Sequence, residues 1–143
     1  MPRSTRTATA ALLIPLLATA CFGSSGSTAS GSGGEDRSSP AALTITLYRH
    51  LAAGKFEKVC GLFGPAALKR ITDTGADCQP FLAKHYDEAA RAGLRDVKVD
   101  ASAIRVNGDT AVVPQSSVTF DGHPSHDGDT QESKQDGKWS ISG

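Results

Sequence analysis

The apolar spacing of the chain changes at Val97-Lys98-Val99-Asp100-Ala101-Ser102-Ala103-Ile104-Arg105-Val106-Asn107-Gly108. Alternate residues from Val97 to Ala103 are apolar, which is typical of a strand with one buried face. Ile104 and Val106 are out of phase, which indicates a bulge, and Asn107-Gly108 is typical of a tight hairpin turn. Helical spacing precedes this stretch and strand spacing follows it. The predicted fold class is therefore α+β, with three N-terminal helices packed on a curved antiparallel sheet of about four strands.

The strands that follow the turn differ in how apolar they are. Ala111-Val112-Val113 and Val118-Thr119-Phe120 are predicted to form the returning strand, bent at Pro114. Asp136-Gly137 is typical of a second turn, and the last strand covers 138–141. The segment 128–135 contains no apolar residue. We therefore expect it to be an exposed edge strand, shortened or frayed.

The first predicted helix begins at Ser39-Pro40, where Ser is a favourable N-cap and Pro suits the first helical position. Leu43, Leu47 and Leu51 follow at intervals of one helical turn, and Gly54 can end the helix. The segment 43–47 also alternates in the manner of a strand. We favour the helix because of its end signals and the following Ala52-Ala53.

Two further helices are predicted between Phe56 and Gly93. The second ends where Gly64-Pro65 interrupts it, and 66–71 can form another turn or two. Asp77 is expected to cap the third helix, and Gly93 to end it. The apolar face of the second helix contains Phe56, Val59, Cys60 and Phe63, and that of the third contains Cys78, Phe81, Leu82, His85 and Ala89.

The N-terminal segment resembles a bacterial lipoprotein signal peptide. Arg3 and Arg6 precede a short apolar run that ends at Leu17-Ala18-Thr19-Ala20-Cys21, which resembles a lipobox. A transmembrane span would need roughly 20 apolar residues without a break such as Pro15. The resemblance implies that the Cys21 thiol is alkylated with diacylglycerol and that Cys21 begins the mature protein.

This interpretation divides the chain into three parts and predicts its location. Residues 1–20 would be the signal peptide, 21–38 a Gly/Ser-rich flexible tether, and 39–143 one small domain. The acylated Cys21 would anchor the protein in the lipid membrane, on the extracytoplasmic face of the bacterial cell. The full chain has 15 Lys+Arg and 15 Asp+Glu, with no basic run, so we expect no nucleic-acid partner.

Lipidation of one of the three cysteines leaves Cys60 and Cys78 as a pair. In an oxidising compartment such a pair is expected to form a disulfide. A reactive thiol pair is the alternative, but the C-x-x-C spacing of redox proteins is absent.

The order of these short motifs resembles the nuclear transport factor two-like (cystatin-like) α+β cone, and in particular small actinobacterial lipoproteins of that superfamily. The resemblance implies a cone between the helices and the curved sheet that binds a small apolar molecule, or acts on one, in some members. Enzymatic relatives place an Asp, His or Tyr inside the cone. The matching pieces are Tyr48, Gly54–Cys60, Cys78, Asn107–Val113 and Asp136–Ile141.

The candidate pocket residues are aromatic side chains and one histidine, namely Tyr48, Phe63, Phe81, His85 and Trp139. A Tyr48–His85 pair in an apolar cone could exchange protons with a substrate. A partly buried structural His85 with one hydrogen bond explains the same pattern, and the apolar strand positions supply no second titratable group. We therefore assign no catalytic residue.

The segment 123–129 has residue types that could form a metal site, but its composition does not favour one. His123, His126, Asp127 and Asp129 are residue types that bind zinc or copper. Pro and Gly surround them, which indicates a mobile loop without the rigid support that a metal site needs. We expect no metal and no cofactor.

The function predicted from the sequence is a membrane-anchored, non-catalytic module that binds a small apolar ligand or an envelope protein. Two alternatives stay open. One is a small-molecule isomerase or dehydratase that uses the cone pocket, and the other is an accessory domain of an envelope complex.

Anchoring is expected to depend on the Cys21 thiol, because two acyl chains give stable membrane binding where one gives only marginal binding. Cys21→Ala should block lipidation and leave the protein uncleaved or released from membranes. Fractionation and gel mobility of the variant beside the wild type measure this. Identical behaviour of the two proteins would contradict the lipoprotein interpretation.

Overall fold

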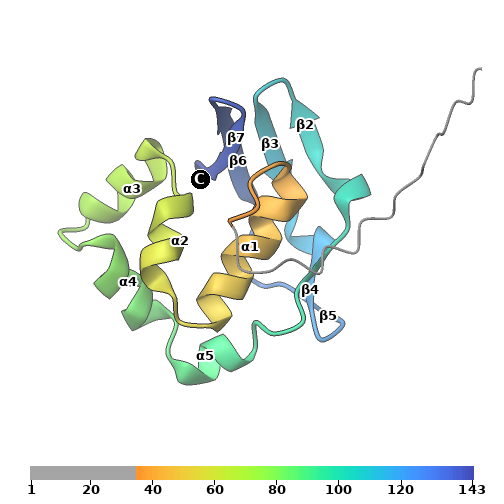
Figure 1. Ribbon diagram of the computed structural model, residues 1–143. Coiled ribbons are helices and arrows are strands. Elements are labelled where there is room, and N and C mark those ends of the chain that lie inside the picture. The colour runs from red at the N-terminus through yellow and green to blue at the C-terminus, as the bar shows by residue number, and fades with distance from the viewer. Residues whose placement is uncertain (1–34) are drawn as a thin grey trace, which may run out of the picture. The chain divides into compact units, whose positions relative to one another are not determined.

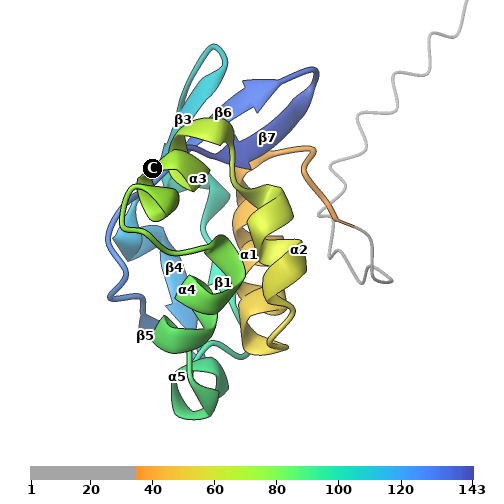
Figure 2. The ribbon, with the colours of Figure 1, turned by 90° about the vertical axis from the view of Figure 1, so that its left-hand side faces the viewer.

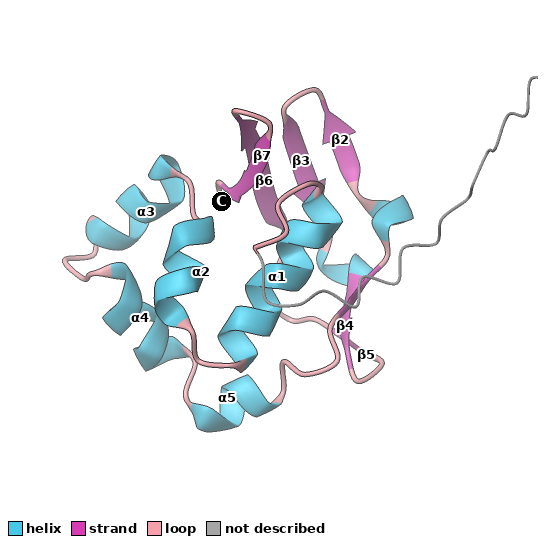
Figure 3. Ribbon diagram, in the orientation of Figure 1, coloured by secondary structure: helices cyan, strands magenta, loops and turns pink. Residues whose placement is uncertain are grey.

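The computed structural model describes residues 35–143, which form an α+β domain with helices on one side of antiparallel sheets (Figures 1 and 3). Cys21 and most of the predicted tether lie outside the described residues. Five α-helices precede the strands, where the sequence predicted three. They are α1 (Pro40–Ala52), α2 (Phe56–Leu62), α3 (Pro65–Thr72), α4 (Cys78–His85) and α5 (Glu88–Ala92).

The strands form two antiparallel sheets, one of order β1-β4-β5 and one of order β2-β3-β6-β7. Two 3₁₀ turns, Ala101–Ala103 and Gln115–Ser117, lie between strands that belong to different sheets. The strands are β1 (Lys98–Val99), β2 (Arg105–Asn107), β3 (Thr110–Val113), β4 (Val118–Phe120), β5 (His123–Pro124), β6 (Thr130–Gln135) and β7 (Lys138–Ile141).

The two sheets share one pairing register. Lys98 pairs with Thr119 in one sheet, and Arg105 pairs with Val112 in the other. The segment from Lys98 to Arg105 is therefore as long as the segment from Val112 to Thr119. The β4·β5 and β3·β6 ladders agree in the same way. Between the sheets, the Asp100 N–H donates to the Ser117 carbonyl at 2.8 Å. The sheets are therefore successive parts of the same hairpins, bent at one level.

The predicted strand face from 97 to 103 is wrong beyond Val99. The Asp100 carboxylate accepts a hydrogen bond from the Ser102 N–H at 3.0 Å and starts a 3₁₀ turn, which leaves Ala101 and Ala103 exposed. The phase change at Ile104 is thus the passage from one sheet to the next. The predicted hairpin is present, with Gly108 and Asp109 as its loop because Asn107 pairs with Thr110.

The polar segment before the last turn is a central strand, where the sequence predicted a frayed edge. β6 pairs with β3 on one side and with β7 on the other. The helices cover only one face of this sheet, so Gln131 and Gln135 on the other face reach solvent and need no apolar character. Glu132 faces the helices and is 1% exposed.

α1 confirms the helix predicted from its end signals and lies between the sheets and α2 (Figures 1 and 2). The Ser39 hydroxyl accepts a hydrogen bond from the Ala42 N–H at 3.2 Å, as an N-cap does. Leu43, Leu47 and Leu51 are buried in the main core. The alternating pattern at 43–47 does not form a strand. Thr44 and Thr46 are buried together with the leucines, because α1 packs against α2 as well as against the sheets.

The predicted third helix is two helices. It stops at Tyr86, and the Asp87 carboxylate caps a new helix by accepting from the Ala90 N–H at 2.8 Å. Ala89 is exposed in α5, so it does not share a buried face with Phe81. The capping tendency of Asp87 outweighs the continuous apolar spacing.

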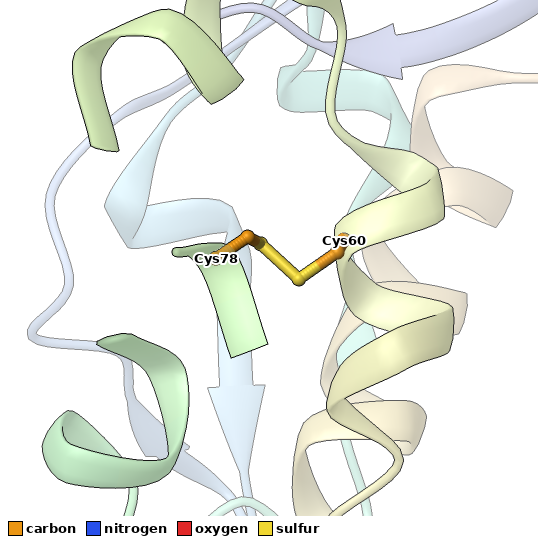
Figure 4. The surroundings of a disulfide bond; sticks show 2 residues. All are labelled: Cys60 and Cys78. Carbon is orange, nitrogen blue, oxygen red and sulfur yellow. A yellow bond between two sulfur atoms is a disulfide. The ribbon is translucent and has the colours of Figure 1, made fainter. Parts of the chain in front are cut away.

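The disulfide prediction is confirmed. Cys60 in α2 and Cys78 at the start of α4 are bonded, with their Cα atoms 6.0 Å apart (Figure 4). The bond joins α2 and α4, which both lie on the side of the domain that faces the viewer in Figure 2. Within residues 35–143, no helix combines the length and the apolar character that crossing a bilayer requires.

Replacing both cysteines with serine should destabilise the domain, because closing a loop of this length stabilises by about 3 kcal/mol. The melting temperature should fall by roughly 10–20 °C. Wild-type protein treated with a reductant is the control and should show the same fall. Two titratable thiols at Cys60 and Cys78 in the denatured, unreduced protein would contradict the bond.

Candidate functional site

A groove of about 510 Å³ lies between the short helices and the loop that follows β5. Its lining is mostly aliphatic and aromatic, with one histidine, one tyrosine and one carboxylate. Pockets of this size and character hold small organic molecules. The lining residues are Phe63, Ile71, Phe81, Leu82, His85, Tyr86, Ala90, Leu94 and Asp127.

Phe63, Phe81 and His85 are the predicted pocket residues that the structure brings together in this groove. His85 is exposed at the end of α4, where the sequence predicted partial burial. Its Nδ1 lies 2.8 Å from the Phe81 carbonyl, and its ring lies 4.2 Å from the Phe81 ring. Both contacts hold the imidazole along the groove wall.

Tyr48 and Trp139, the other two predicted pocket residues, lie in the hydrophobic core. The Tyr48 ring meets Phe120 edge-on at 4.8 Å, and Ser125 and Asp127 are its polar neighbours. Burial, followed by the charge of Asp127, raises the pKa of Tyr48 well above its ordinary value. The hydroxyl therefore stays protonated.

The loop at 125–129, which the sequence predicted to be mobile, is held by hydrogen bonds. The Ser125 N–H donates to the Val118 carbonyl at 2.9 Å, and the Gln115 side chain donates to the Ser125 carbonyl at 2.6 Å. The Gln115 N–H donates to the Asp129 carboxylate at 2.9 Å. These bonds hold the residues on either side of Asp127, whose exposed side chain lines the groove, a position that the sequence did not predict.

A second groove of about 360 Å³ adjoins the first and shares Ala90, Leu94 and Asp127 with it. The two histidines of the loop region lie here, but no group of three or more potential metal ligands is placed to hold an ion among residues 35–143. The other lining residues are Gly93, Phe120, Asp121, His123, Pro124 and His126.

A third hollow of about 570 Å³, which shares Leu94 with both grooves, lies where α1 ends and β1 begins. Arg49, Arg95 and Lys98 line it, and none of the predicted pocket residues does. We place the candidate site in the two adjoining grooves, because there aromatic residues and a shared carboxylate occur together.

Glu132 is a buried carboxyl that no motif or spacing in the sequence indicates. Its Oε1 is 2.8 Å from the Thr44 hydroxyl of α1, and its Oε2 has no hydrogen-bond partner within the described part of the chain. Burial raises the pKa of this carboxyl to about 8. Neither groove includes Glu132, so it stays in the core and away from the candidate site.

Comparison with known proteins gives no match, whether with family models, curated proteins or solved structures.

Glu132 should make the domain less stable as pH rises. Between about pH 4.5 and pH 8 the unfolded chain releases this proton while the folded protein keeps it, so the free energy of unfolding falls. Glu132→Gln removes the titrating group and its pH dependence, and it keeps the shape of the side chain. The stability of the variant relative to wild type should rise by about 2 kcal/mol or more from pH 5 to pH 8, since each pH unit contributes up to about 1.4 kcal/mol.

Denaturant unfolding at several pH values measures this difference. Glu57→Gln is the matched control, because Glu57 is exposed in α2. A difference between Glu132→Gln and wild type that does not change with pH would contradict the protonated, buried state.

Proposed function

We propose that the protein is a membrane-anchored extracytoplasmic lipoprotein whose domain binds a small, mainly apolar molecule without chemical conversion. The observation that carries this proposal is the groove of about 510 Å³ with aromatic and aliphatic walls. The disulfide is consistent with an exported protein, since such bonds persist in oxidising compartments.

The arrangement of the strands supports a relationship to the nuclear transport factor two-like cone. The shared register of the two sheets corresponds to one curved sheet of four chain passes, with α1 in its hollow. The five helices correspond to the three predicted ones if α3 is the extra turn after the second and α4 with α5 make up the third.

Binding is favoured over the isomerase or dehydratase alternative. Proton transfer needs an acid and a base that converge on one substrate position. The Tyr48 hydroxyl is buried and protonated, and His85 is exposed on the groove wall with Nδ1 on the Phe81 carbonyl. An accessory role in an envelope complex would use the same domain with a protein in place of the small molecule.

Filling the groove tests the proposal. Ala90 lines both grooves, so Ala90→Trp should lower the affinity for the neutral fluorescent probe N-phenyl-1-naphthylamine at least tenfold. Ala89→Trp is the matched control, because Ala89 is its exposed neighbour in α5 and lines neither groove. Equal binding by both variants, or no binding by the wild type, would contradict the proposal.

A further inference from the structure

The polar group common to both grooves is the carboxylate of Asp127. It lines the first groove beside Tyr86 and the second beside Phe120. Tyr48, in the core, has the same carboxylate among its polar neighbours. An exposed carboxylate therefore lies where two mainly apolar grooves adjoin, and Tyr86 and Phe120 are among the residues that line them.

Within residues 35–143, no lysine or arginine forms an ion pair with this carboxylate. Neither groove is lined by a lysine or an arginine, and the second groove adds Asp121. Among residues 35–143, the ion pairs are Lys69–Asp73 and Arg105–Asp129, and Asp127 belongs to neither. Arg91, although it is in α5, turns its guanidinium towards Gly54.

The aromatic rings in the two grooves also favour a cation over an anion. The faces of aromatic rings attract cations, and a carboxylate among such rings is a favourable site for an ammonium group. The histidines that face this region are His85, His123 and His126. An anionic ligand would meet Asp127 and Asp121 without a compensating lysine or arginine.

We infer that the two adjoining grooves form one site for a small organic cation, with its apolar body in the first groove and its ammonium group on the Asp127 carboxylate. This inference rests on the proposed binding function and names the ligand class. In this site Asp127 distinguishes ligands by their charge. Phe81, Leu82 and Leu94 contact the apolar body of the ligand, whatever its charge.

Three naphthalene probes with matched bodies test the inference: 2-(2-naphthyl)ethylamine, 2-(2-naphthyl)ethanol and 2-naphthylacetate. They are titrated at pH 7.5 into the mature chain carrying Cys21→Ser, which keeps the tether and avoids the lipid. Nuclear magnetic resonance shift changes locate binding and give dissociation constants. The amine should bind at least tenfold more tightly than the alcohol, and the acid most weakly, with shifts at residues 81–94 and 120–127.

Asp127→Asn should bring the amine to within about threefold of the alcohol and leave the alcohol unchanged. Asp109→Asn, at an exposed hairpin loop, removes the same charge elsewhere and should keep the preference. Equal binding of the three probes, a preference that survives Asp127→Asn, or shifts outside the grooves would overturn the inference and leave the apolar groove intact. Failure of all three probes to bind would overturn the proposed function as well.

Discussion

The common bend of the antiparallel hairpins determines where the rest of the domain lies. Two 3₁₀ turns and the loop at 125–129 occur at the same level of three neighbouring chain passes, and the register is preserved across them. A hairpin can change direction in this way only if each pass bends with its partner, since one extra residue would move every later side chain to the opposite face. α1 packs across this bend, where it contacts β1 of one sheet and β3 and β7 of the other.

The contact between α1 and the sheet contains a polar pair that packing alone would not require. Glu132 and Thr44 are both buried, and they share one hydrogen bond. A neutral carboxyl costs less to bury than an ionised one, which is why the pKa of Glu132 lies near 8. A shift of α1 by one turn would remove Thr44 from the carboxyl and leave both Glu132 oxygens unpartnered. The pair therefore favours one position of the helix over its neighbours.

The sequence predicted those elements whose signals are local. The helix after Ser39 and the pairing of Cys60 with Cys78 needed only capping preferences and cysteine arithmetic, and both are present. It failed where distant segments decide the outcome. The polar strand β6 is central because β3 and β7 pair with its backbone, which its side chains do not reveal. For the same reason the position of Asp127 depends on hydrogen bonds from Gln115 and was not predictable from residue types.

The walls of the candidate site are the part of the domain that depends most on crosslinking. α4 has 8 residues and α5 has 5, and helices this short are not stable without tertiary contacts. α4 contributes Leu82 to the buried main core and is joined to α2 by the disulfide, whereas α1 and the strands contribute most of that core. Reduction should therefore loosen Phe81 and His85 at the groove before it disturbs the strands. An oxidising compartment, which the lipoprotein proposal implies, is the environment in which this wall keeps its shape.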